Sequence, residues 1–339
     1  MLEAAGFDTW LVNARDVKHL PGRPKTDTLD AVWLCKVAER QMIRPSFVPP
    51  APIRRLRDLT RYRVDLVGDR TREKNRIEKF LEDAGIKLSV VASDIFGVSG
   101  RAMMDALIGG EHDPAILADL AKTRLRTKLP QLREALTGQF NDHHAFVLAQ
   151  MLSHVDDLDQ RIATIEGHLD DELAPFTDEL ERLDEIPGIG RAAAAQILAE
   201  IGTDMTRFPT AGHLASWAKF SPTVKESAGK HIGTAATGRG DRYLARALGE
   251  AAIGASRTNT FLSERYRRIV RHRGKKIALV AVGRSILVII WQILSHPDAR
   301  YIDLGPHHHD NRGNTNQAIR RHLNALHALG YNVTVTPTT

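Results

Sequence analysis

Two aspartates near the start of the chain have the spacing of a metal site. Asp27 and Asp30 lie at i and i+3 of a helix that we expect to begin at Thr26 or Asp27, which places both carboxylates on one face with Cβ atoms about 5–6 Å apart. Such oxygen ligands select Mg²⁺ or Mn²⁺, and paired ions about 3.5–4 Å apart can activate an attacking oxygen and stabilise a leaving one. Helix capping is the alternative role, because aspartate is common at helix starts.

Ser227 is a candidate nucleophile in a loop of small residues, Glu226-Ser227-Ala228-Gly229-Lys230. A serine hydroxyl attacks phosphorus when a base or metal removes its proton and cations stabilise the developing charge. The nearby cations that could do this are Lys225, Lys230, Arg239 and Arg242. An ordinary loop is the alternative, and the spacing differs from that of a nucleotide-binding P-loop.

The charge of the chain favours a polyanionic partner. The 339 residues carry a net charge of +6 and have a pI near 9.5, which argues for association with polyanions. Basic residues crowd positions 54–79, including Arg61 and Arg63, and positions 265–276. Each cluster could neutralise several phosphates, with log affinity falling by about 0.9 per contact for each tenfold rise in salt. Acidic residues interleave with the first cluster, so a solvated helix face is its alternative interpretation.

The elements that must position these residues are mainly helical. We expect a strand at Phe7 to Asn13, a helix from Thr26 or Asp27, and a long basic helix from about Ile53 to Ala84. Short helices broken by glycine and proline should follow between Ser89 and Leu136. From His144 to Leu173 apolar residues recur at alternating steps of three and four, which is heptad spacing and predicts either an intersubunit coiled-coil arm, used for dimerisation, or a long bundle helix.

The segment Ile186-Pro187-Gly188-Ile189-Gly190 has the turn of a helix-hairpin-helix. Gly188 and Gly190 would let the backbone approach a phosphate, and the amides of the next helix would point at it. An ordinary helix–helix turn is the alternative.

Neither disulfide chemistry nor a membrane location is expected. The single cysteine, Cys35, lies in an apolar helical stretch and should be a small core residue in a reducing cytosol. No secretory signal opens the sequence. The apolar run Ile277 to Leu294 contains Arg284 near its middle, and a central arginine costs about 2.5–3.5 kcal/mol on insertion scales, so we expect a buried core helix.

Several segments, taken in order, resemble the insertion-sequence one-ten family of transposases. Those similar to its RuvC-like DEDD domain include Lys25-Thr26-Asp27-Thr28-Leu29-Asp30-Ala31 and Leu56-Arg57-Asp58-Leu59-Thr60-Arg61-Tyr62-Arg63. Those similar to its C-terminal serine domain include Ile186-Pro187-Gly188-Ile189-Gly190, Glu226-Ser227-Ala228-Gly229-Lys230 and Gly240-Asp241-Arg242-Tyr243-Leu244.

The resemblance implies a recombinase that cuts and rejoins DNA. It makes Asp27 and Asp30 the last two acids of a Mg²⁺ (or Mn²⁺) binding DEDD set, and Ser227 the serine that forms the covalent DNA link. It also implies a guide RNA, DNA element ends and a DNA target as partners, a homo-oligomer, and a cytoplasmic, nucleoid-associated location in a bacterium. Gly188, Gly190, Lys225, Lys230, Arg239, Arg242, Arg61 and Arg63 are the nucleic-acid-binding residues that we expect.

The resemblance and the sequence pattern together predict a mostly α fold with a small α/β part. The expected domains are a partial RuvC-like (RNase H-like) DEDD domain (1–88), a helical connector (89–140), a coiled-coil helix (141–182), a C-terminal serine domain with the helix-hairpin-helix (183–296) and a polar tail (297–339).

One departure from the family pattern affects the expected activity. The first Asp and the Glu of the DEDD set should precede the Phe7 to Asn13 region, yet the sequence starts at Met1. The chain is therefore expected to be a truncated copy, an internal start or a remnant, in which two acids alone should hold metal poorly. The family's function is predicted, with an inactive polypeptide as the alternative. Two rivals stay open: a non-catalytic nucleic-acid-binding protein, and a metal-dependent junction nuclease that needs the carboxylates but not Ser227.

Overall fold

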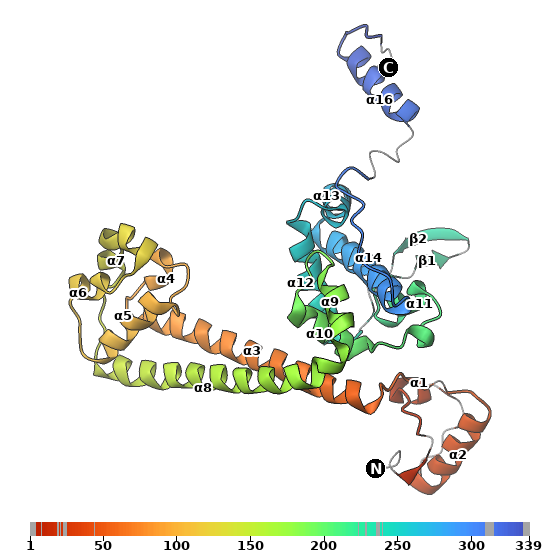
Figure 1. The fold of residues 1–339 in the computed structure, drawn as a ribbon, viewed down its shortest axis with the longest axis horizontal. Coiled ribbons are helices and arrows are strands. Elements are labelled where there is room, and N and C mark those ends of the chain that lie inside the picture. The colour runs from red at the N-terminus through yellow and green to blue at the C-terminus, as the bar shows by residue number, and fades with distance from the viewer. Residues whose placement is uncertain are drawn as a thin grey trace. The chain divides into compact units, whose positions relative to one another are not determined.

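The computed structural model describes most of the chain and is mainly helical (Figure 1). The described residues are 5–7, 9–18, 20, 22, 26–43, 45–222, 224–227, 229–234, 238, 240–308 and 315–334. They divide into two compact units, Met1–Arg54 and Arg55–Thr339, and each unit is described by itself.

The first unit contains α1 (Ala14–Lys18) and α2 (Asp27–Glu39). The predicted start of the second helix is confirmed. The predicted strand at Phe7 to Asn13 is wrong, because its described residues form only an isolated bridge between Val12 and Pro45 and one bond from Ser46 N to Leu11 O of 2.7 Å. Proline has no N–H to donate, so this bridge cannot extend into a regular ladder.

The core role predicted for Cys35 is also wrong. Cys35 is exposed on α2, and Val37 is the residue of that helix that the structure buries. Apolar character alone did not bury the thiol. Cys35 lines an open pocket together with Trp10, Val12 and Ile43, so it borders solvent and is not part of a packed core. The large apolar side chains exposed in this unit include Phe7, Trp10, Leu11, Leu29, Val32 and Met42.

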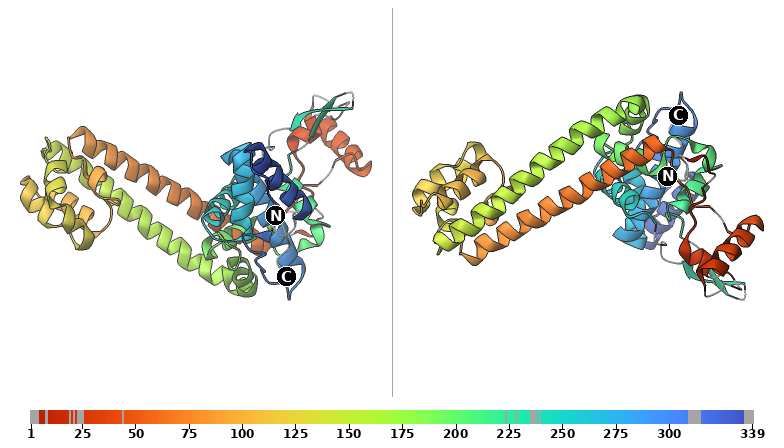
Figure 2. Two further views of the ribbon diagram at one scale, coloured as in Figure 1. Left: turned by 90° about the horizontal axis from the view of Figure 1, so that it is seen from above. Right: turned by 90° about the horizontal axis from the view of Figure 1, so that it is seen from below.

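Two long helices form a stalk in the second unit. α3 (Ala51–Asp83) and α8 (Asp142–Leu173) lie side by side in all the views of Figures 1 and 2. Leu66 packs against Leu158 and Ile162. Arg63 pairs with Glu166 and Arg70 pairs with Asp159, and because the partner numbers fall as the arginine numbers rise, the two helices are antiparallel.

The apolar heptad stripe of α8 is buried within the chain. Its buried members are Leu148, Val155, Leu158, Ile162, Leu169 and Leu173. Since α3 and the helices at the far end of the stalk supply part of this burial, the stripe has apolar neighbours without a second subunit. An intersubunit coiled coil stays a prediction.

A small helical lobe fills the connection between the two stalk helices. It consists of α4 (Leu88–Val91), α5 (Val98–Ile108), α6 (Pro114–Asp119), the 3-10 helix η2 (Thr123–Lys128) and α7 (Leu129–Ala135). The predicted run of short helices is therefore confirmed. Ile77 and Leu81 of α3 and Leu148 and Leu152 of α8 share one apolar core with this lobe.

The helices after the stalk pack around one long apolar helix. They are α9 (Thr177–Asp184), α10 (Arg191–Ile201), α11 (Ala211–Trp217), α12 (Arg242–Ser256), α13 (Phe261–Arg273) and α14 (Lys275–Ser295). Short 3-10 helices, η3 (Ala174–Phe176) and η4 (Met205–Arg207), precede α9 and α11, and α16 (Thr315–Ala328) lies near the C-terminus.

α14 is long and apolar enough to cross a membrane by length and composition alone. It contacts α9, α11, α12 and α13, and it buries residues such as Val282, Ile286, Leu287 and Ile290 completely. These contacts are those of a core helix, as the sequence predicts.

The turn between α9 and α10 lies against α12. Gly188 has φ +89°, and a Cβ atom at this residue would meet the Ala251 carbonyl oxygen at 2.1 Å and the Ala255 amide nitrogen at 2.6 Å. Only glycine combines a left-handed backbone with so close an approach. Helix packing therefore explains Gly188, while phosphate binding by the helix-hairpin-helix stays a prediction.

We expect Gly188→Ala to lower the free energy of unfolding by about 2–6 kcal/mol, because the backbone strain and the clash with α12 each cost about 1–3 kcal/mol. Urea unfolding followed by circular dichroism measures the change. Gly249→Ala is the matched control, since Gly249 lies inside α12 with open space around its Cβ position. Alanine there should leave stability unchanged or raise it by about 0.5–1 kcal/mol; equal losses in both variants would contradict the packing role.

Candidate functional site

The candidate nucleophile lies at the end of a β-hairpin. β1 (Val224–Ser227) and β2 (Lys230–Thr234) pair antiparallel, and Ser227 opposite Lys230 is the last pair before the turn. Gly229 in that turn has φ +73°, a conformation that glycine adopts without strain. The hairpin thus holds the backbone of Ser227 beside that of Lys230, whose side chain is exposed.

Asp241 lies directly before α12 and connects the start of that helix to α3. One carboxylate oxygen of Asp241, Oδ1, accepts hydrogen bonds from the amides of Tyr243 at 2.8 Å and Leu244 at 2.9 Å. This is a standard N-cap, which satisfies amides that have no partner within the helix. The other oxygen, Oδ2, lies 2.5 Å from Nη2 of Arg61 on α3. Asp241 therefore fixes the N-terminus of α12 and ties it to the stalk.

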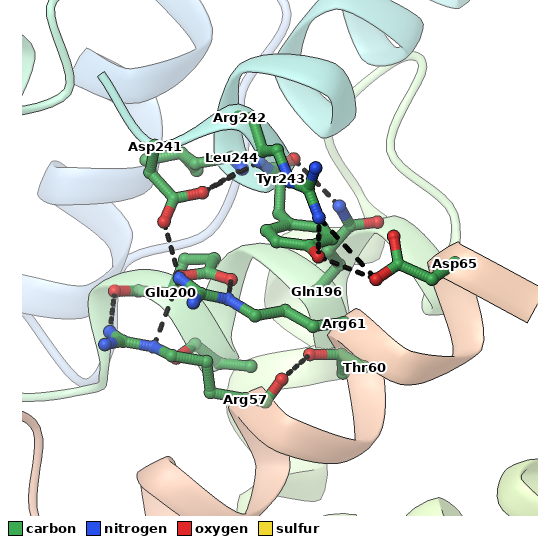
Figure 3. A network of polar contacts seen from close by, with 11 residues as sticks. Arg57, Thr60, Arg61, Asp65, Gln196, Glu200, Asp241, Arg242, Tyr243 and Leu244 are labelled. Carbon is green, nitrogen blue, oxygen red and sulfur yellow. Dashed lines mark hydrogen bonds and ion pairs between the residues drawn. The ribbon is translucent and has the colours of Figure 1, made fainter. Parts of the chain in front are cut away.

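Glu200 is the buried centre of the same network (Figure 3). Its side chain is 1% exposed, and it accepts two hydrogen bonds from Arg61, at 2.7 and 2.8 Å. Arg57, one turn earlier on α3, donates to the backbone oxygens of Ala199 and Glu200 at 3.1 and 2.6 Å. The end of α10 is therefore clamped to α3 through both side-chain and backbone acceptors.

Tyr243 completes the network on the side of α12. Its hydroxyl donates to Oδ2 of Asp65 at 2.9 Å, and its backbone oxygen accepts from Nε2 of Gln196 at 2.8 Å. The guanidinium groups of Arg61 and Arg242 lie 4.9 and 4.6 Å from the centre of its ring, a distance at which cation–π attraction operates. The ring therefore packs between two arginines that come from different helices.

The charges in this network perturb one another. Burial raises the pKa of Glu200, and the hydrogen bonds and charges of Arg61 and Arg57 oppose that rise. The hydrogen bond that Arg61 donates to Glu200 raises the pKa of Arg61, whereas burial lowers the pKa of Arg57. The carboxylate therefore depends on its arginine partners, because a buried charge without them has no compensation for lost hydration.

The residues predicted to bind nucleic acid or DNA fall into four groups. Arg61 and Arg63 are held by carboxylates, the latter by Glu166 at 2.5 Å, so each has a structural role within the chain. Arg242 is 76% exposed, although Asp65 lies 3.6 Å away, and Lys230 is also exposed. Gly190 caps α10 in an extended conformation. The side chains of Lys225 and Ser227, and all of Arg239, lie outside the described residues. Nucleic-acid binding by any of them stays a prediction.

Asp27 and Asp30 lie in the first turn of α2. Asp27 is exposed and Asp30 is half-buried. Within the described residues no group of three or more His, Cys, Asp or Glu side chains could hold a metal ion. Two carboxylates can bind one Mg²⁺ together with water and substrate phosphate, but these two alone do not complete a two-ion site.

Sequence reasoning missed Arg57, Glu200, Asp241 and Tyr243 as a connected group. A signal existed for two of them. Glu200 is the only acid in the apolar helix Ala192 to Ile201, and Asp241 follows a glycine directly before a helix, which is typical of an N-cap. The pairing of these acids with Arg57 and Arg61 joins residues about 140 to 180 positions apart, and no local pattern encodes it.

Two family models match separate parts of the chain. One, described as a transposase of the DEDD IS110 type, matches residues 1–86, and the other, the transposase IS116/IS110/IS902 family, matches residues 180–267. The match over residues 180–267 contains α10, the hairpin with Ser227, and Asp241. The match over residues 1–86 contains Asp27, Asp30, Arg57 and Arg61.

Curated relatives resemble most of the chain. An uncharacterized 42 kDa protein of insertion element IS900 from Mycobacterium paratuberculosis is 28% identical, over 87% of this chain and 78% of the relative. A 43.6 kDa protein of insertion element IS110 from Streptomyces coelicolor is 26% identical, over 81% and 71%. The transposase for insertion sequence element IS1111A from Coxiella burnetii is 23% identical, over 86% and 73%.

We expect Glu200→Ala to lower the free energy of unfolding by about 3–5 kcal/mol, because it leaves two partly buried arginines without their carboxylate. Thermal and urea unfolding measure the loss. Glu172→Ala is the control, since Glu172 pairs with the exposed Arg55 at 3.1 Å and an exposed pair is worth less than about 1 kcal/mol. A loss for Glu200→Ala no larger than that of the control would show that the clamp contributes little.

Proposed function

Because the chain belongs to the IS110/IS116/IS902 family of transposases, we propose that it cuts and rejoins DNA through Ser227. In the proposed step, the Ser227 hydroxyl gives up its proton as its oxygen attacks a backbone phosphorus, and a phosphodiester between the serine and the DNA strand forms. The bond from that phosphorus to one deoxyribose oxygen breaks, and this oxygen takes up a proton and leaves as a free hydroxyl end. A hydroxyl of the target DNA then attacks the ester, which transfers the strand and regenerates the serine.

The position of Ser227 in the hairpin is the observation that carries this proposal. Ser227 is the last paired residue of β1, opposite Lys230, and the chain that follows leads to Asp241, which Arg61 and the amides of α12 hold in place. A nucleophile is effective when rigid elements support its position. Asp241 is such an anchored residue, and it follows the hairpin in the sequence.

Exposed cations on the hairpin and at the start of α12 support DNA as the partner. Lys230 and Arg242 are exposed, and a positive charge near the attacked phosphorus stabilises the charge that develops there. We assign the same role to Lys225 and Arg239 on sequence position alone. Gly188 and Gly190 would add a backbone contact to phosphate at the start of α10.

The proposal includes a divalent metal because one of the two matching family models is of the DEDD type. Asp27 and Asp30 would supply two oxygen ligands to one Mg²⁺ (or Mn²⁺), and a bound ion would supply charge stabilisation at phosphate. Guide RNA, a homo-oligomer and a cytoplasmic, nucleoid-associated location are further expectations that follow from the family resemblance.

Non-catalytic binding of nucleic acid is the second candidate function. The observation that favours it is that the described residues contain no group of three or more metal-ligating side chains. It predicts that neither Ser227 nor the aspartates affect any property of the bound complex.

We expect Ser227→Ala to abolish a covalent protein–DNA adduct while DNA affinity changes less than about twofold, because only the attacking oxygen is removed. The adduct is measured as a labelled DNA band that moves with the protein on a denaturing gel. Ser153→Ala is the matched control, since Ser153 is exposed on the stalk helix α8, and it should leave the adduct intact. An adduct that persists in Ser227→Ala would rule out this nucleophile, and a wild-type chain that binds DNA without any adduct would favour the second candidate.

We expect Asp27→Asn combined with Asp30→Asn to lower the adduct yield at fixed Mg²⁺ by at least about tenfold, because a neutral amide is a weaker ligand for a hard cation than a carboxylate. The dependence of yield on Mg²⁺ concentration is the measurement, and the circular dichroism spectrum checks that α2 is still folded. An unchanged Mg²⁺ dependence would show that these aspartates act only as helix-start residues.

A further inference from the structure

The surface formed by α13 and α14 carries an unusual excess of positive charge. Between positions 265 and 297 the chain has eight Lys and Arg residues and no Asp or Glu. The eight are Arg265, Arg267, Arg268, Arg271, Arg273, Lys275, Lys276 and Arg284. All of them except the half-buried Arg265 are exposed. None of these residues takes part in the Ser227 chemistry proposed above.

The geometry of the helix pair brings part of this charge together. α13 and α14 are joined by Gly274 alone, with φ +80°, and they pack against each other. Arg265 lies about 14 Å before this turn along α13, and Arg284 lies about 15 Å after it along α14, at 1.5 Å per residue. The two arginines therefore lie at similar distances from the turn, measured along two helices that pack against each other. Arg268 lies one helical turn from Arg265 on α13, and residues three apart are neighbours on a helix surface.

Arg265 has unmet hydrogen-bonding capacity. Its Nε atom is buried and has no hydrogen-bond partner among the described residues. No carboxylate in the described part of the chain lies within 4 Å of Arg265 or Arg284. Glu264 lies 3.9 Å from Nε of Arg268, and its charge also acts on Arg265.

The three arginines also repel one another. Burial lowers the pKa of Arg265, and the charges of Arg268 and Arg284 lower it further. Like charges held together destabilise the free protein, and an anion that binds between them removes that cost. Arginine suits this role because its planar fork matches the oxygens of a phosphate.

We propose that Arg265, Arg268 and Arg284 form a binding site for a phosphodiester of a nucleic-acid backbone. The row of exposed cations that continues along α13 and into the start of α14, as far as Lys276, favours an extended polyanion, because successive phosphates could contact successive basic side chains. This inference rests on the proposed function, since it names the surface on which that function's nucleic acid would lie. The phosphodiester could come from DNA or from RNA.

Binding of fluorescein-labelled nucleic acid to the full-length chain, followed by fluorescence anisotropy at several salt concentrations, tests the proposal. One arm uses a DNA duplex and the other an RNA hairpin with the same number of phosphates. The variants are Arg284→Gln and Arg268→Gln, and the matched control is Arg161→Gln, which removes the same charge from an exposed position on α8.

Arg284→Gln and Arg268→Gln should each weaken affinity about tenfold, as loss of a charge-assisted hydrogen bond does. Each should also reduce the slope of log affinity against log salt for the duplex by about 0.9, the value for one phosphate contact. Arg161→Gln should change neither quantity. Loss in the DNA arm alone or in the RNA arm alone identifies the source of the phosphodiester, and loss in both arms assigns the site to either backbone.

Arg265→Gln provides a second readout that a merely structural arginine would not give. Because it removes a half-buried charge that has two like charges nearby, the thermal midpoint of the free protein should stay the same or rise while affinity falls. A fall in both stability and affinity would overturn the proposal for Arg265.

Failure of this inference differs from failure of the proposed function. If the wild-type chain binds DNA with a steep salt dependence but the α13 and α14 variants behave like Arg161→Gln, the inference is wrong and the proposed function stands. If the wild-type chain binds neither DNA nor RNA, both are wrong.

Discussion

The salt bridge between Glu200 and the arginines of α3 is the interaction on which the second unit depends. A carboxylate that is 1% exposed loses nearly all its hydration, and only charged partners with good geometry offset that loss. Arg61 provides two hydrogen bonds and Arg57 provides a third contact at 3.2 Å. The same Arg61 then reaches Asp241. One guanidinium therefore joins the stalk, the end of α10 and the start of α12.

α12 connects the features to which we assign function. Its N-cap, Asp241, follows the hairpin that contains Ser227, and its C-terminal half packs against Gly188 in the turn before α10. It also packs against α13 and α14, which carry the arginine cluster. The proposed nucleophile precedes α12 in the chain and the proposed phosphodiester site lies on helices that pack against α12, so a shift of α12 would be expected to disturb both.

Local patterns in the sequence were sufficient for the helices but not for their partners. The heptad stripe from Leu148 to Leu173 and the core helix with Arg284 follow from apolar spacing, and the structure confirms both helices. The strand expected at Phe7 to Asn13 failed because a strand needs a neighbour to bond with, and Pro45 cannot extend the single bridge that forms. The core role predicted for Cys35 was wrong because the burial of a side chain depends on which other segments cover that face of the helix. The Glu200 network was missed because distant segments create it.

The stalk has a mechanical consequence. α3 is continuous from the clamped Arg57 to Leu81 in the lobe core, a length of about 36 Å at 1.5 Å per residue. Its antiparallel partner, α8, stiffens it through apolar packing and ion pairs. A tilt of about 10° at the clamp would therefore move the lobe by about 6 Å as a rigid lever. Small rotations at Glu200 are amplified at a distance, without any bending of the helices between.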